Sequence, residues 1–462
     1  MITTRWMNFA YLVLLARAVA LIASSLITPV EVVGDYATDY YPRGEFLASN
    51  LSFATSHDIP LDFYLRPPGS SVLVAIGVFF GADAHSAVIV ARITNVFAEC
   101  LALAFLFSGL QLLRIADSWK LILASVLMVQ PYTVSYLNSP GPDTVVMFLM
   151  SIFTYLLMCQ VVRRGGHAKN ASLVRILVGG VLAFTVLLRA EMVVLAPLLA
   201  LLWFITDRSS KKFELASKLP VLIPIIIAMS LNALYSFHVQ DRMNMWSGGQ
   251  DRFTNKDEIV WLRSWYGDES VKTDIGWYWY RGQHLSMDYV PAQAVRDSQS
   301  RALVSEVVES ARRVTQSDAA DFAPLRILAE ETRADSPFDW YVGIPVFHAF
   351  AMWIDVPIRS QWWSFFHQVN WRVPFILTAF CSTFLVLGCV LMLFRLLTTS
   401  SSTERWVFAS FLFIILSRTG LFAATISMPE SRYIMPVVPV LIMMCLFGWA
   451  SIISRAQKDL FH

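Results

Sequence analysis

Two aspartates near the start of the chain have the residue type and spacing of a general base with a close neighbour. Asp35 and Asp39 stand four positions apart, shortly after the first long apolar run. Residues four apart share one face of a helix, so both carboxylates would lie together just outside a membrane. A carboxylate placed there could take a proton from a hydroxyl, alone or helped by a divalent metal. A solvated pair that caps a helix is the alternative.

An arginine follows in a rigid setting. Arg66 directly precedes Pro67, Pro68 and Gly69. Two prolines keep the chain extended, so they fix Arg66 near the lipid headgroups. Because arginine binds phosphate through two parallel hydrogen bonds, the pattern predicts a phosphate ligand. An ordinary interfacial arginine that reaches toward water is the alternative.

Further charges stand at the borders of apolar runs. Asp143 opens one run, where it also suits the dipole of a helix. Arg189 and Glu191 separate two runs, and charges at that depth are costly and usually functional. The same pattern returns before the last run, in Glu430, Arg432 and Tyr433. We expect six of the charged side chains to converge on the outer membrane face: Asp35, Asp39, Arg66, Asp143, Arg189 and Arg432.

The composition excludes several classes of protein. The chain has 462 residues, of which 56% are hydrophobic and 15% charged, whereas soluble domains carry about 25% charged residues. A soluble enzyme, a disordered chain and a coiled coil are excluded, and a net charge of +2 gives no reason to expect nucleic acid. The five cysteines lie in apolar runs without a CxxC pair, so neither a disulfide framework nor a zinc site is expected. The pattern predicts a polytopic membrane protein.

Ten apolar runs are long enough, or nearly so, to cross a bilayer. They cover 9–30, 85–113, 119–137, 143–162, 173–188, 191–206, 219–238, 372–397, 405–427 and 432–453. The run at 70–82 is too short and is predicted to be a re-entrant or interfacial helix. If both chain ends are cytoplasmic, most Lys and Arg residues of the short loops lie inside, as the positive-inside rule requires. The first run is taken as a retained helix rather than a signal peptide.

The chain divides into three predicted parts. Residues 1–238 form an N-terminal membrane module with a catalytic outer loop at 31–82, residues 239–371 form a large outer domain, and residues 372–462 contain the last membrane helices. Within the outer domain, the pattern predicts an amphipathic helix near 291–316. Its aromatic residues suit either a membrane interface or stacking on sugar rings.

Other charges that stand inside apolar runs are given structural roles. Arg92, Asn95 and Glu99 lie on one helix face and are expected to bind one another or neighbouring helices. Arg418 has no obvious partner nearby in the sequence. A structural role is favoured for Arg418, and a role toward substrate stays open.

The order of these motifs resembles a known family. An outer-loop Asp beside a Tyr is followed by Arg-Pro-Pro-Gly, Pro-Gly-Pro-Asp and Arg-Ala-Glu, and then by a large outer loop and Arg-Tyr-Ile-Met-Pro. This order is similar to that of the polyprenyl-phosphate-sugar-dependent glycosyltransferases of the GT-C superfamily. Within it, the chain most resembles the dolichyl-phosphate-mannose protein mannosyltransferase-like group, which includes the lipid A aminoarabinose transferase.

The resemblance implies both a fold and an activity. The fold would be an all-α polytopic bundle of about ten transmembrane helices, with juxtamembrane helices and one large loop on the periplasmic or lumenal side. The activity would be an inverting transfer of a sugar from a polyprenyl-phosphate donor to a hydroxyl of a lipid, glycan or protein. The expected location is the inner membrane of a bacterium, with the active site facing the periplasm. No cofactor is certain, and a divalent metal stays open.

The resemblance also assigns roles to residues. Asp35 would be the general base, with Asp39 as the alternative, and Asp143 would be the acid of the second loop. The donor phosphate would be held by Arg66, Arg189, Arg432 and Tyr433. Other substrate contacts would come from Tyr40, Glu191 and Glu430.

Rival functions remain. A lipid-linked glycan ligase or polymerase would use a similar site. A transporter or flippase of lipid-linked sugars would more often show polar residues at mid-membrane on several helices. A non-catalytic assembly subunit is the third alternative.

Overall fold

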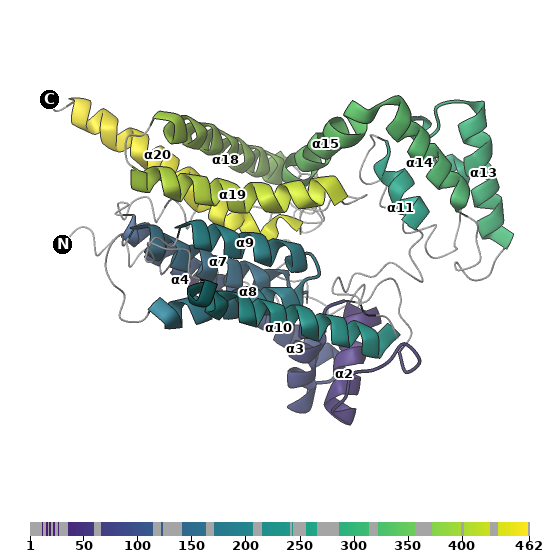
Figure 1. Ribbon diagram of the computed structural model, residues 1–462, viewed down its shortest axis with the longest axis horizontal. Coiled ribbons are helices and arrows are strands. Elements are labelled where there is room, and N and C mark those ends of the chain that lie inside the picture. Colours follow the sequence, from purple (N-terminus) through teal and green to yellow (C-terminus); the bar gives the residue numbers. More distant parts are fainter. Residues whose placement is uncertain are drawn as a thin grey trace.

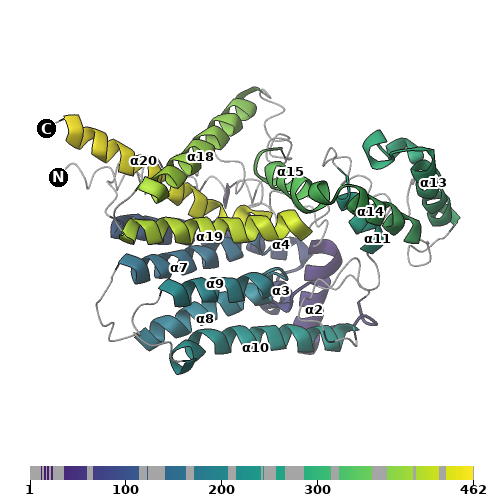
Figure 2. The ribbon, with the colours of Figure 1, turned by 45° about the horizontal axis from the view of Figure 1, so that its top comes forward.

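The structure is a computed structural model, and the regular elements in the part that it describes are all helices. Apart from isolated positions, that part comprises 36–59, 66–113, 141–162, 171–206, 215–240, 256–265, 286–313, 322–355, 372–398, 402–425 and 433–460. Figures 1 and 2 show a bundle of long helices, with a group of shorter helices projecting beyond one end.

The bundle confirms most of the predicted apolar runs as helices. Its members are α4 (Ala84–Leu112), α7 (Asp143–Val162), α8 (Ala171–Leu188), α9 (Met192–Thr206), α10 (Leu215–Gln240), α18 (Arg372–Thr398), α19 (Ser402–Thr425) and α20 (Val438–Leu460). The predicted runs at 9–30 and 119–137 lie almost wholly outside the described residues.

Length and composition make this an integral, multi-pass membrane protein. Among the described residues, four helices are long and apolar enough to cross a bilayer: Ala84–Leu112, Asp143–Val162, Lys218–Val239 and Thr403–Thr425. Along α10, Leu219, Ile223, Ile226 and Ile227 form an apolar stripe in which each residue is more than 40% exposed. Soluble proteins rarely leave so continuous a patch open to water, so the stripe is suited to lipid.

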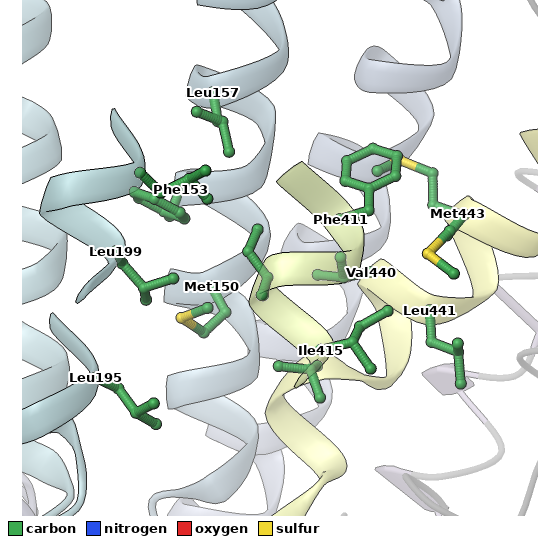
Figure 3. Close-up of a cluster of buried hydrophobic side chains, with 14 of the residues drawn as sticks. Met150, Phe153, Leu157, Leu195, Leu199, Phe411, Ile415, Val440, Leu441 and Met443 are labelled. Atoms are coloured by element: carbon green, nitrogen blue, oxygen red, sulfur yellow. The ribbon is translucent and has the colours of Figure 1, made fainter. Parts of the chain in front are cut away.

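The bundle core joins helices that are distant in the sequence. Figure 3 shows side chains of α7, α9, α19 and α20 meeting in one cluster, among them Met150, Phe153, Leu195, Phe411 and Leu441. A close crossing of α8 and α10 adds to this packing. A Cβ atom on Gly179 would lie 2.7 Å from the backbone oxygen of Val221, so only glycine fits at this crossing.

Two short helices lie against one end of the bundle. A π-helical turn, η1 (Tyr36–Tyr40), leads into α2 (Tyr41–Asn50), which packs against α3 (Pro68–Phe79). With 12 residues, α3 is shorter than the roughly 20 that a span needs, in keeping with the predicted interfacial or re-entrant helix. We call this end of the molecule the α3 end (Figure 2).

The projecting helices have a hydrophobic cluster of their own. α11 (Lys256–Arg263), α13 (Ser298–Arg313) and α14 (Ala323–Asp335) pack around Trp261, Val304 and Leu325. The helix predicted near 291–316 is therefore confirmed with narrower bounds. A segment of η5 (Asp339–Gly343), α15 (Ile344–Phe350) and η6 (Ala351–Asp355) leads back to α19. The division of the chain at 238 and 371 stays a prediction.

Stability of the projecting helices should depend on pH through Glu258. This residue lies on the side of α11 that carries Trp261, and burial raises its pKa to about 8. Between about pH 5 and pH 8 the folded state holds a proton that the unfolded state has lost, so stability falls as the pH rises. The slope is at most about 1.4 kcal/mol per pH unit. We expect Glu258→Gln to flatten this dependence, measured as hydrogen exchange in α11.

The neighbouring residue supplies the control. Asp257→Asn changes a less buried carboxylate on the same turn and should leave the slope in place. Identical pH profiles for the wild type and Glu258→Gln would contradict the assignment.

Candidate functional site

Four charged side chains from separate parts of the chain form a buried ion-pair network. They are Asp143 at the start of α7, Arg189 and Glu191 in the turn between α8 and α9, and Arg418 in α19. The Arg189 Nη2 lies 3.0 Å from the Asp143 Oδ1, and its Nε lies 3.0 Å from the Glu191 Oε1. The Arg418 Nη2 reaches the same Oε1 at 3.0 Å. Of the six charged side chains expected to converge, Asp143 and Arg189 lie together here, and Glu191 joins them.

The turn between α8 and α9 explains how two of these charges are presented. α8 ends at Leu188, and the backbone N–H of Met192 donates to the carbonyl of Arg189 as α9 begins. The break predicted from Arg189-Ala190-Glu191 is therefore present. The two charged side chains leave the tight turn in the same direction and meet each other.

Arg418 is the member whose importance the sequence did not reveal. Its partner Glu191 is 227 residues away in the sequence. Its Nε also donates to the backbone oxygen of Tyr433, and its guanidinium lies 5.1 Å from the centre of the Phe422 ring, which stacks on Tyr433. The signal that could have found it is a buried arginine in an apolar helix, which is as costly as the charge at Arg189.

Glu191 stays ionised in spite of its burial. Burial alone would raise the pKa of its carboxyl, but Arg189 and Arg418 together hold that pKa below its ordinary value. The network thus contains two acids and two arginines and is neutral as a whole. Such a set is held together because removing any one member leaves an uncompensated buried charge.

A second ion pair holds the segment at 36–59. The Arg43 Nε lies 2.6 Å from the Asp39 Oδ1, and the guanidinium also donates to the backbone oxygens of Ala54 and Ile59. Arg43 is fully buried, so it fastens the 51–59 segment to α2. Sequence reasoning paired Asp39 with Asp35 and missed Arg43, although the same four-residue spacing points to it.

Arg66 lies where the predicted rigid segment holds it. Pro67 is extended, with φ −56° and ψ 149°, and Arg66 is buried with its guanidinium 5.4 Å from the centre of the Tyr40 ring. Gly69 then rests on the end of α8, because a Cβ atom there would lie 2.5 Å from the backbone oxygen of Leu187. The segment that carries Arg66 therefore packs against the end of α8, at a residue two positions before Arg189.

This close approach yields a testable consequence. Gly69→Ala must push α3 away from α8, so we expect a loss of about 1–3 kcal/mol in stability and a clear loss of activity. Gly77, on the same helix, has open space around its Cβ position, so Gly77→Ala should be neutral or slightly stabilising. Thermal unfolding of the two purified variants measures the difference, and equal stability would contradict the close packing.

The remaining predicted residues fall into two groups. Asp35, Glu430 and Arg432 lie outside the residues that the structure describes. Arg92, Asn95 and Glu99 are buried along α4, and their expected contacts with one another or with neighbouring helices stay a prediction. In the described part of the chain, no group of three or more His, Cys, Asp or Glu side chains could hold a metal ion.

Comparisons with known proteins give structural matches only. A scan against protein-family models found no match, and neither did a search of the curated proteins. Among solved structures, the Archaeoglobus fulgidus oligosaccharyltransferase in its apo form matches 99% of this chain and 52% of its own, with 12% identity and a TM-score of 0.49. This chain thus spans about half the length of that protein.

Two further structures contain bound lipids. The archaeal oligosaccharyltransferase AglB from A. fulgidus, with an inhibitory peptide and a dolichol-phosphate, covers 98% of this chain and 52% of its own at 11% identity and TM-score 0.47. ArnT from Cupriavidus metallidurans, bound to undecaprenyl phosphate, matches 96% of this chain and 77% of its own, with 12% identity and a TM-score of 0.38. Each of these similarities extends over nearly the whole of this chain, at 11–12% identity.

Proposed function

We propose that this protein is a membrane glycosyltransferase. It moves a sugar from a polyprenyl-phosphate donor to a hydroxyl of a lipid, glycan or protein acceptor, with inversion, on the periplasmic side of a bacterial inner membrane. The observation that carries the proposal is the docking of the Arg66 segment against the turn that holds Arg189 and its ion-pair network. Arginines and acids thus lie together at one end of an apolar bundle, as transfer from a lipid-linked phosphate requires.

The arginines would hold the donor. A phosphate ester next to a bilayer needs cations that bind its oxygens and stabilise the charge that grows as the phosphate leaves. Arg66, with its guanidinium over the Tyr40 ring, is buried at the α3 end, and Gly69, three residues later, packs against the end of α8 that precedes Arg189. We assign the phosphate to Arg66 and Arg189, together with Arg432 and Tyr433.

The base is assigned to Asp35 rather than Asp39. Asp39 already binds Arg43, with its Oδ1 2.6 Å from the Arg43 Nε, so this carboxylate is engaged in holding the loop. The role of Asp39 would be to hold the first outer loop. In the step itself, Asp35 takes the acceptor proton while the hydroxyl oxygen bonds to the anomeric carbon. The bond from that carbon to the phosphate oxygen breaks, and polyprenyl phosphate leaves.

The other acids would act by position. Asp143 and Glu191 both contact Arg189, so they fix the direction of its guanidinium. Glu430 would contact the substrate from the segment before the last helix. A second acid to protonate the leaving group is not required, because phosphate leaves readily as an anion.

The proposal is tested first by what the protein binds. We expect lipids extracted from the purified protein to contain a phosphate-linked polyprenyl sugar, identified by mass spectrometry, and expect it to be depleted in Arg66→Ala. A transporter would retain such a lipid as well, so the same protein is placed in vesicles with labelled donor. Movement of the intact donor across the bilayer without loss of its sugar would contradict the proposal.

A further inference from the structure

The projecting helices form a cavity that has no role in the reaction described so far. Its volume is about 290 Å³, and it lies where α11, α14 and η5 meet. Pockets for small molecules have volumes of about 300–1,000 Å³, so this cavity is at the small end of the range. It suits a single small group, and a helix or a folded domain would not fit.

One face of α14 is directed to this cavity, and a different face builds the core of the projecting helices. The cavity face consists of four residues with the spacing of one side of a helix: Arg326, Ala329, Glu330 and Arg333. The core face carries Leu325 and Leu328. The three charged residues of the cavity face are exposed, so core packing does not require them and a ligand can reach them.

Part of the cavity lining is apolar and held in place. It consists of Val260 from α11, Ala329 and Trp340, of which Ala329 is fully buried and Trp340 is 7% exposed. The guanidinium of Arg263 lies 5.2 Å from the centre of the Trp340 ring, and the backbone N–H of Trp340 donates to the carbonyl of Ser336. Because these contacts fix the indole, this part of the lining is preformed.

The rest of the lining carries charges of both signs. Asp257 of α11 and Glu330 supply carboxylates, and Arg326 and Arg333 supply guanidinium groups. The Arg326 Nε lies 2.9 Å from the Glu330 Oε1, in a pair whose side chains are 60% and 49% exposed. A carboxylate can accept hydrogen bonds from two neighbouring hydroxyls, and a guanidinium can donate two to neighbouring oxygens. This part of the lining is therefore suited to a ligand with several hydroxyl groups.

The two parts of the lining together fit the surface of a sugar ring. A pyranose presents C–H groups on its faces and hydroxyl groups around its edge, so both parts of the lining would have a partner. A hydrocarbon chain would remove the charged groups from water without replacing their hydrogen bonds, which is costly. A simple ion would meet side chains of its own charge sign and would leave the apolar part of the lining unused.

We propose that this cavity binds a sugar ring of the acceptor. The inference rests on the proposed function, and it narrows the acceptor to a glycan or a glycolipid. The helices that form the cavity project beyond the α3 end, where the donor site is assigned (Figure 2). The acceptor is therefore longer than one sugar: one ring occupies the cavity while a hydroxyl further along the chain meets the donor.

The test first measures binding in the absence of donor. Oligosaccharides are released by mild acid from the membranes that contain the protein, and saturation-transfer NMR follows their binding to the full-length protein in nanodiscs. We expect Glu330→Gln and Arg333→Ala each to weaken this binding by about fivefold or more, because each changes a charged hydrogen-bonding group. The matched controls are Glu331→Gln and Arg301→Ala, which change exposed charges outside the cavity lining and should stay within about twofold.

Transfer to acceptor lipids from the same membranes then separates the inference from the proposed function. Glu330→Gln should raise the KM for the acceptor and leave kcat and the affinity for undecaprenyl phosphate unchanged. If the wild type transfers sugar and the cavity variants bind and react like their controls, the sugar site is wrong and the proposed function stands. If the wild type binds oligosaccharides at the cavity but cleaves no donor, the proposed function is wrong and only the sugar site stands. A wild type that binds no oligosaccharide, whether or not it binds a Gly-Ser peptide, overturns the inference.

Discussion

Asp35→Asn is expected to abolish sugar transfer while leaving donor binding unchanged. A positioned general base contributes about 10²- to 10⁴-fold to the rate, and Asn cannot accept the proton of the acceptor hydroxyl. The donor phosphate is assigned to arginines on other segments, so the affinity for the donor lipid should stay near that of the wild type. Single-turnover transfer and lipid binding, measured on the same preparation, separate the two effects.

Asp39 provides the comparison for this experiment. Asp39→Asn breaks the ion pair with Arg43, which also holds the backbone at Ala54 and Ile59. The expected result is a partial loss of transfer together with reduced stability of the segment at 36–59. Arg43→Gln should reproduce that partial loss, because it breaks the same pair from the other side. If Asp39→Asn loses all turnover while Asp35→Asn stays fully active, Asp39 rather than Asp35 is the general base.

Arg66→Ala should cause the largest loss of donor affinity. Hydrogen bonds to a charged group contribute about 1.5–3 kcal/mol, so removal of the guanidinium should weaken polyprenyl-phosphate binding by about 10- to 100-fold. Arg66→Lys should recover only part of this, since an ammonium group is a point charge and cannot form two parallel hydrogen bonds. Binding is measured with undecaprenyl phosphate in nanodiscs.

The control for Arg66 is an arginine at the other end of the bundle. Arg175 lies in the second turn of α8, whereas Arg189 follows the last turn of the same helix. Arg175→Ala changes the total charge equally and should leave lipid binding unchanged. Equal losses of affinity in the two variants would show that net charge, rather than the position of Arg66, governs binding.

Periodicity and breaks in the sequence predicted much of the helical framework. Long apolar runs form helices because a backbone in lipid must satisfy its own hydrogen bonds, and α7, α10 and α19 follow this rule closely. The break at Arg189-Ala190-Glu191 and the extended segment at Pro67 are also local properties, so the sequence alone indicated them. The same holds for the amphipathic pattern of α13.

The partners within the site were harder to predict. Which carboxylate pairs with which arginine depends on how helices pack, and Glu191 finds Arg418 only because α9 and α19 are neighbours in the fold. The tight contact of Gly69 with Leu187 is likewise a property of two packed backbones. Arg43 is different, because its spacing from Asp39 was visible, and the interpretation of Asp39 as a candidate base drew attention away from it.

The most direct test of the central claim is the fate of the bond between sugar and phosphate. Wild-type protein in nanodiscs is supplied with its co-purifying polyprenyl-phosphate sugar and with acceptor lipids from the same membranes, and products are followed by mass spectrometry. We expect polyprenyl phosphate to appear in step with a glycosylated acceptor, and neither product to form with Asp35→Asn. A donor that stays intact with the wild type, or equal product with Asp35→Asn, would contradict it.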